Sequence, residues 1–157
     1  MKIKRIICLA LALVLLPSCG RKTDDAPASP AQRLAAVFRD QMRENPQRST
    51  EETARTLLAA LPFTGECMPA EEGWLNGFDK EITGFTEGTM FSPMIGSIPF
   101  VGYVFRLKEA GEADGFVRTL RENGNLRWNV CTQADEMVTE TVGDTVLFIM
   151  SPLSFDD

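Results

Sequence analysis

Residues 145–150 have the sequence Thr145-Val-Leu-Phe-Ile-Met150, in which every position from Val146 onward is apolar. A strand with one face in water alternates apolar and polar residues, whereas an unbroken apolar run is typical of a strand buried on both faces. We therefore expect this strand to lie centrally in a sheet. Met137–Val142 precedes it across Gly143-Asp144, and a glycine in the first turn position favours a type II′ hairpin between them.

Four earlier segments also have strand or helix patterns. Phe100–Lys108 is the clearest strand, because apolar residues occupy every second position along one face. Leu126–Cys131 alternates in the same way and predicts another strand, and Ile82–Glu87 is a weaker candidate. Between them, Ala113–Glu122 has the spacing of an amphipathic helix, which Asn123-Gly124 would end in a left-handed conformation.

Two short amphipathic helices are expected before the sheet. Ser29-Pro30 is typical of a helix start and Asn45-Pro46 of a helix end, and Ser49-x-x-Glu52 is a capping box for a second helix. Apolar residues recur at helical spacing in both helices: Leu34, Val37, Phe38, Met42, Ala54, Leu57, Leu58 and Leu61. We expect these stripes to pack on the sheet, and docking of a partner is the alternative.

Together these elements predict an α+β fold. Its sheet is antiparallel-rich, in the order β-β-α-β-β-β, with the two N-terminal amphipathic helices packed on it and all helices on one face. Residues 63–79 contain several glycines and a proline, and are expected to be irregular. We assign residues 30–157 to a single domain.

The first 18 residues have the order of a secretory signal peptide. A basic start, from Lys2 to Arg5, is followed by the apolar run Ile6–Leu16 and then by small residues. As a helix this run would be roughly 16 Å long. That length is about half of the ~30 Å hydrocarbon core, which argues against a membrane span.

The end of this signal, Leu16-Pro17-Ser18-Cys19, resembles the lipobox of bacterial lipoproteins. In those proteins the cysteine receives a diacylglycerol and becomes the mature N-terminus. The resemblance implies lipidation of Cys19, cleavage after residue 18 and a lipidated tether over residues 19–29. It also implies an extracytoplasmic location on the cell membrane, where two or three acyl chains, palmitate among them, hold a protein stably. An ordinary signal peptide with an incidental Cys19 is the alternative.

Composition excludes several kinds of chemistry. The formal net charge is −6, which disfavours nucleic acid and anionic headgroups as partners. The chain has no histidine, so it has no histidine-activated nucleophile and no histidine-containing zinc site. Ser97 is not in a G-x-S-x-G motif, and we interpret Glu71-Glu72 and Asp156-Asp157 as solvated charge. We predict no catalytic residue, metal site or cofactor.

Two cysteines remain once the signal and the lipid are taken into account. Cys8 leaves with the signal peptide, and Cys67 and Cys131 stay in the mature chain. In an oxidising compartment an isolated pair commonly forms a disulfide. Two free thiols, each a small buried hydrophobe, are the alternative.

One apolar segment, Met90–Pro99, is rich in methionine and flanked by prolines. The first interpretation is a buried crossover that covers the sheet. The second is a partner or ligand surface formed by Met90, Met94, Ile95 and Phe100, because methionine side chains adapt to varied partners. Trp74 and Trp128 are interpreted as core or edge anchors.

The second half of the chain resembles a known family. Its segments, in order, are the Ser92–Ile98 stretch, Val101–Leu107, Arg127–Cys131 and Gly143–Met150. They resemble a family of small uncharacterised lipoproteins, common in clostridia and their relatives and known only as a domain of unknown function. The resemblance covers roughly residues 74–151 and implies an anchored module with no established activity. Relatives usually carry a histidine where this chain has Pro99-Phe100.

These observations predict a lipid-anchored extracytoplasmic lipoprotein. We expect it to act as a non-enzymatic binding or assembly module on the cell membrane, with an envelope protein as a candidate partner and no nucleic acid. The alternative is a cell-wall carbohydrate hydrolase that uses two carboxylates. The sequence leaves the ligand, the oligomeric state and the type of envelope open.

Overall fold

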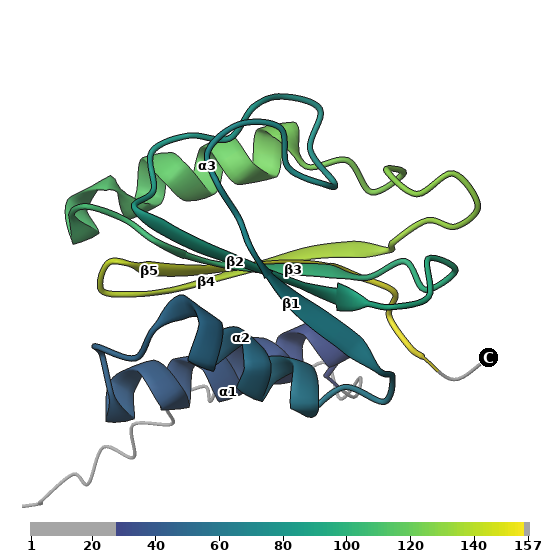
Figure 1. Ribbon diagram of the computed structural model, residues 1–157, viewed down its shortest axis with the longest axis horizontal. Helices are drawn as coiled ribbons and strands as arrows, with labels where there is room; N and C mark the ends of the chain where they lie inside the picture. Colours follow the sequence, from purple (N-terminus) through teal and green to yellow (C-terminus); the bar gives the residue numbers. More distant parts are fainter. Residues whose placement is uncertain (1–27, 156–157) are drawn as a thin grey trace, which may run out of the picture.

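A computed structural model describes residues 28–155, which form one antiparallel sheet between two helical layers (Figure 1). The fold class is α+β, as the sequence predicts. The sheet has five strands in the order β1-β2-β3-β5-β4. The elements are α1 (Pro30–Glu44), α2 (Thr50–Ala59), β1 (Gly65–Pro69), β2 (Glu87–Pro93), β3 (Val101–Arg106), the short 3-10 helix η1 (Ala110–Glu112), α3 (Ala113–Asn123), β4 (Glu136–Val142) and β5 (Thr145–Ser151).

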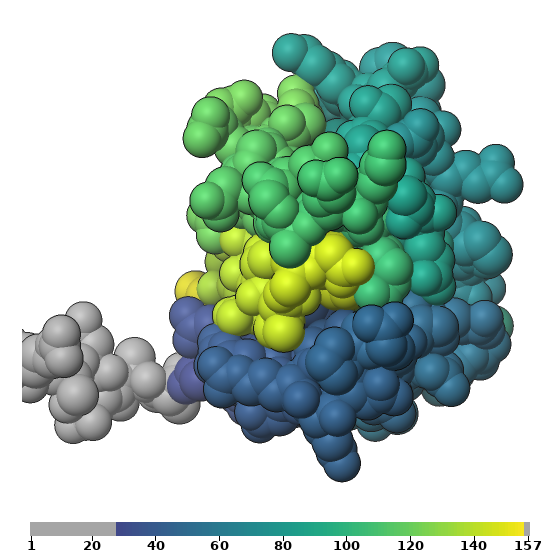
Figure 2. Space-filling view, turned by 90° about the vertical axis from the view of Figure 1, so that its left-hand side faces the viewer, coloured from purple at the N-terminus to yellow at the C-terminus, as the bar shows by residue number. Residues whose placement is uncertain are grey.

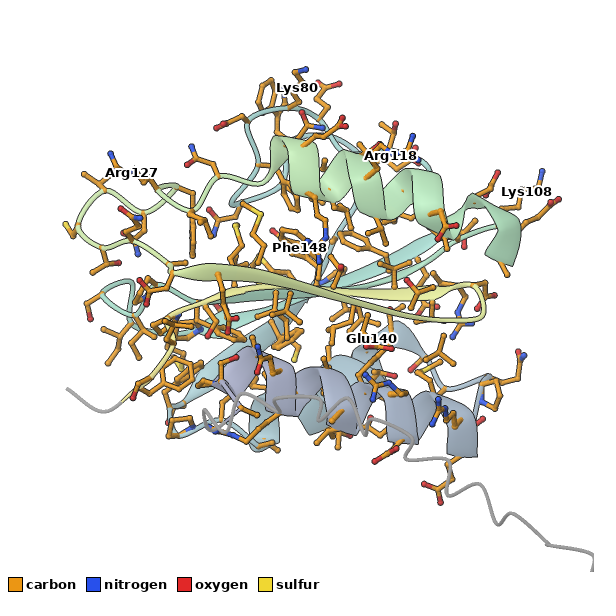
Figure 3. All side chains as sticks on the ribbon, turned by 180° about the vertical axis from the view of Figure 1, so that it is seen from behind. Lys80, Lys108, Arg118, Arg127, Glu140 and Phe148 are labelled. Carbon is orange, nitrogen blue, oxygen red and sulfur yellow. The ribbon has the colours of Figure 1, made fainter. Side chains whose placement is uncertain are left out.

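The apolar strand β5 has every residue buried. Phe148 and its neighbours two positions away face a cluster under α3, while Leu147 and Ile149 face a cluster under α1 and α2. The prediction of a central strand covered on both faces is therefore confirmed, and Figure 3 shows Phe148 on the α3 side of the sheet. The prediction of helices on one face only is wrong. A strand that is apolar on both sides needs two covering layers, and α3 supplies the second.

Both N-terminal helices begin where the sequence predicts. Ser29 Oγ accepts a hydrogen bond from Gln32 N at 3.2 Å, and Gln32 Oε1 accepts one from Ser29 N at 3.2 Å. Ser49 Oγ accepts from Glu52 N at 3.2 Å at the start of α2. These bonds satisfy backbone donors that have no partner within the helix.

The predicted order of elements is wrong in the middle of the chain. Leu126–Cys131 is a loop, and β1 lies in the segment expected to be irregular. Ile82–Glu87 is not a strand: Ile82 forms an isolated bridge, and β2 begins only at Glu87 and runs into the first four residues of the expected Met90–Pro99 crossover. The observed order is β-β-β-α-β-β. Two asparagine side chains explain why Leu126–Cys131 is not a strand. Asn125 Oδ1 accepts a hydrogen bond from Arg127 N at 2.8 Å, and Asn129 Oδ1 accepts one from Cys131 N at 3.4 Å. These side chains bind backbone donors that a sheet would use.

The sequence predicts a particular backbone conformation for two glycines, Gly143 and Gly124. Gly143 has φ of +61° and Asp144 a negative φ, as a type II′ hairpin requires. Gly124, by contrast, has φ of −67°, so α3 does not end in the predicted left-handed conformation. Figure 2 shows the β4–β5 hairpin between the α3 layer and the α1–α2 layer.

Candidate functional site

A groove of about 450 Å³ lies on the α3 side of β1 and β2, beside Trp74. It is lined by Met68–Glu72, Trp74–Asn76, Met90 and Tyr103, and we call it the Trp74 groove. Trp74 is 71% exposed, so its indole is not the core or edge anchor that the sequence suggests. A groove with an exposed aromatic face and a few polar groups is a common form of ligand site.

The segment that carries Trp74 is fixed to the domain by backbone hydrogen bonds. Gly73 and Ile82 form a two-way bridge, with N–H···O distances of 2.9 and 2.8 Å. Gly73 has φ of +133°, a conformation that suits glycine. Glu72 Oε1 accepts from Gly84 N at 2.6 Å and from Phe85 N at 3.3 Å. The position of Trp74 is therefore set by the fold around it.

Tyr103 lies at the inner side of the groove. Its hydroxyl donates to Asn76 O at 2.8 Å and contacts Met90 Sδ at 3.2 Å. Burial raises the pKa of the Tyr103 phenol well above its ordinary value, and the hydrogen bond to Asn76 opposes this only in part. The phenol is a neutral group that holds the 70–76 segment against the sheet.

The carboxylates of the groove have different surroundings. Both glutamates are exposed, and Glu72 in addition accepts hydrogen bonds from two backbone N–H groups. The site thus combines an aromatic face, thioether sulfur from Met68 and Met90, and carboxylate oxygens. Such a set can stack on a ring and accept hydrogen bonds from hydroxyl or amine groups. Sequence reasoning missed the groove, because nothing in residues 63–79 indicates which side chains point outward.

The structure does not bring the predicted partner surface together. Met90 is half-buried in β2 and lines the Trp74 groove. Phe100 is 2% exposed and packs against Phe63 and Phe91, with ring centroids 5.4 and 5.7 Å away. Met94 and Ile95 are exposed in the β2–β3 loop. The four residues therefore do not form one surface: Met94 and Ile95 face solvent, Met90 lines the Trp74 groove and Phe100 is buried.

Cys67 and Cys131 are both free thiols in the structure, the second of the two interpretations that the sequence leaves open. Cys67 is on β1 and packs against the cluster under α1 and α2, whereas Cys131 is exposed in the loop after α3. Different layers of the fold carry the two residues. Burial raises the pKa of the Cys67 thiol. Cys19, the predicted lipidation site, lies outside the described residues.

Within residues 28–155, no helix has the length and apolar character needed to cross a bilayer. In that same range, no group of three or more cysteine or carboxylate side chains is arranged to hold a metal ion.

The chain has no significant match among family models, curated proteins or solved structures. The resemblance to clostridial lipoproteins therefore stays a prediction, and the groove has to be interpreted from its own residues.

Proposed function

We propose that this protein is a lipid-anchored extracytoplasmic lipoprotein that binds an envelope ligand in the Trp74 groove without catalysing a reaction. The observation that carries the proposal is an indole 71% exposed beside a 450 Å³ groove, on a segment fixed by hydrogen bonds. Covering a large apolar side chain contributes about 1.5–3 kcal/mol, and that contribution is available to a ligand.

The chemistry of the groove favours a saccharide. Sugar rings have one face of C–H groups, which stacks on an indole, and hydroxyl groups at their edges, which donate to carboxylates. Trp74 supplies the ring and Glu71 the acceptor. A binding protein outside the cytoplasm has cell-wall glycan within reach, in keeping with the lipobox at Cys19.

A hydrolase remains the second candidate, on one observation: Glu71 and Glu72 both line the groove. Glycosidases need two carboxylates about 5–9.5 Å apart, one of them a proton donor. Glu72 Oε1 already accepts hydrogen bonds from two backbone N–H groups, at 2.6 and 3.3 Å, so this oxygen is engaged within the fold and is less available to a substrate. Binding is therefore the function that we place first.

The test uses the full chain, purified from membranes and titrated with soluble peptidoglycan saccharides. The chain has two tryptophans, so Trp128→Phe leaves Trp74 as the only indole reporter. We expect the fluorescence of Trp74 to change with saccharide and the Trp74→Ala variant to lose binding at least ~tenfold, equal to about 1.4 kcal/mol. Binding that survives in Trp74→Ala would exclude the groove, and release of shorter saccharides would favour the hydrolase.

Anchoring is tested separately by Cys19→Ser. The wild-type protein should float with the membrane fraction and carry an acyl mass on its N-terminal peptide, and the variant should do neither. A wild-type protein that is extracted by salt alone would contradict the lipid anchor.

A further inference from the structure

One end of the molecule carries four exposed apolar side chains. Met94 is 66% exposed, Ile95 65%, Val130 99% and Leu153 60%. They come from three separate segments: the β2–β3 loop, the loop after α3 and the residues that follow β5. In Figure 1 all three segments are at the same end, opposite the β4–β5 hairpin. We call these four residues the apolar tip.

Hydrogen bonds join the three segments of the tip. Asn129 Nδ2 donates to Gly96 O, which links the loop after α3 to the β2–β3 loop. Leu153 N donates to Asp135 Oδ2 at 3.0 Å, which links the end of the chain to the same loop. The apolar side chains are therefore presented together by one connected set of loops.

The tip also differs from the rest of the chain in charge. The protein has a formal net charge of −6. Residues 94–100, 124–134 and 152–155 nevertheless contain a single charged side chain, Arg127, with Asp135 adjoining them. Figure 3 shows Arg127 at this end and Lys108 at the other. Net charge argues against an anionic surface as a partner, but most of the 22 carboxylates lie outside these stretches, and those that border them in the sequence are Asp135 and Asp156-Asp157.

The described chain begins at this same end. Ala28 lines a hollow together with Leu153 and Phe155. α1 then leads away from the tip over 15 residues, about 22 Å. Since extended chain covers at most ~3.6 Å per residue, Cys19 lies within roughly 30 Å of Ala28. A bilayer that holds a lipid on Cys19 is therefore close to the apolar tip.

We propose that the apolar tip docks into the interface of the bilayer that carries the lipid anchor. This inference rests on the lipid anchor of the proposed function. The four apolar side chains enter the boundary between headgroups and acyl chains, where an interfacial apolar face is buried ~5–10 Å deep. Arg127 is placed to pair with a lipid phosphate. Lipid and tip together then fix the orientation of the domain on the membrane.

Cys131 provides the reporter, because it is exposed and adjacent to Val130. The full chain with Cys67→Ala is labelled at Cys131 with a fluorophore and placed in vesicles of phosphatidylethanolamine and phosphatidylglycerol. A small share of the lipid carries a nitroxide on its acyl chain. The matched control combines Cys67→Ala and Cys131→Ser with Gly111→Cys, since a side chain at Gly111 meets no atom within 4 Å at the opposite end.

We expect the acyl-chain nitroxide to quench the Cys131 label at least ~threefold more than the Gly111→Cys label. The double variant Met94→Asp and Ile95→Asp should reduce the quenching of Cys131 to the control level. Both positions are largely exposed, so this variant should keep the near-ultraviolet circular dichroism of the wild type.

The other outcomes overturn the inference in different ways. Equal quenching at both positions, in protein that still floats with the vesicles, means that the anchor holds but the tip does not dock. Protein that fails to float contradicts the lipid anchor and the docking together. In native membranes, a Cys131 crosslink to a protein, with no acyl-chain quenching, would identify a protein as the occupant instead.

Discussion

The ring of Phe91 on β2 lies directly against Gly102, its register partner on β3. The three atoms nearest to a Cβ built on Gly102 all belong to this ring, and all are closer than the 3.0 Å that Cβ atoms keep. Phe91 is fully buried under α1 and α2, and its ring also contacts Phe100. The glycine is therefore required by close packing and not by its backbone conformation.

Gly102→Ala should lower the free energy of unfolding by about 1–3 kcal/mol, because the ring has to move within a packed core. Urea denaturation followed by circular dichroism measures the change. The matched control is Gly115→Ala on α3, where a Cβ meets nothing within 4 Å. Alanine there should stabilise the protein by about 0.5–1 kcal/mol. A loss at residue 102 no larger than experimental error would contradict the packing.

Tyr103→Phe should destabilise the protein by about 1 kcal/mol, because it removes the donor to Asn76 O. The substitution should also change how the free energy of unfolding depends on pH in alkaline solution. The pKa of the phenol is higher in the folded state than in the unfolded chain, where it is near 10. The contribution of the protonated phenol to the free energy of unfolding is therefore complete below the unfolded-state pKa, and it decreases as the pH rises through the folded-state pKa. Wild type should lose stability above about pH 10 faster than Tyr103→Phe does.

The chain has one tyrosine, so its ionisation can be followed by absorbance without assignment. A phenol that titrates near pH 10 in folded protein would contradict the burial of Tyr103 in the Trp74 groove.

Glu140 on β4 accepts two hydrogen bonds from Arg39 on α1, at 3.0 and 2.7 Å (Figure 3 labels Glu140). The hydrogen bond from Arg39 lowers the pKa of Glu140 in the folded state. The ionised Glu140 therefore stabilises the folded protein fully above the pKa of an unfolded glutamate, about 4.3. This stabilisation is lost as pH falls through the lower folded-state pKa. Glu140→Gln should therefore flatten the stability profile below about pH 4.5, as measured by thermal unfolding across acidic pH.

The control for Glu140 is Glu51→Gln. Glu51 pairs with Arg55 at 2.7 Å, but both side chains are more than half exposed, and such pairs contribute little. Equal pH profiles for the two variants would mean that the Arg39–Glu140 pair adds no stability.

Cys131 should react with a thiol reagent at least ~tenfold faster than Cys67. Cys131 is exposed, while burial raises the pKa of the Cys67 thiol and reduces its thiolate fraction. Single variants, Cys67→Ala and Cys131→Ala, assign the two rates. If neither thiol reacts until a reductant is added, the disulfide interpretation is correct instead.

The sequence predicts those elements whose signals are local. Caps at Ser29 and Ser49 and the apolar run of β5 determine their structure within a few residues. Both helix starts and the strand are found as expected, although at Ser49 the Glu52 carboxylate bonds to Ser49 Oγ and not to Ser49 N as a complete capping box requires. β1 has no such signal. It is five residues long, begins with Gly65, ends with Pro69 and depends on pairing with β2. Both terminal residues are typical of turns, so only the neighbouring strand makes the segment extended.

The Trp74 groove is less predictable than the fold. Its walls come from residues 68–76 and from two strands, and their meeting depends on the Gly73–Ile82 bridge. At residues 126–131 the opposite happens: the sequence predicts a regular element and the structure has a loop. Its alternation predicts a strand, but Asn125 and Asn129 offer the backbone a local partner, and Val130 is left 99% exposed. Asn125 and Asn129, four residues apart, are the signal in the sequence that opposes the apolar pattern.

The two edges of the sheet have a consequence for solubility. β1 is short and ends in Pro69, which has no N–H to offer another chain. β4, at the other edge, carries two charged side chains, Glu136 and Glu140, and Glu140 is bound by Arg39 of α1. Both features oppose edge-to-edge pairing between molecules. A sheet protected in this way resists aggregation even when many copies are crowded onto one surface.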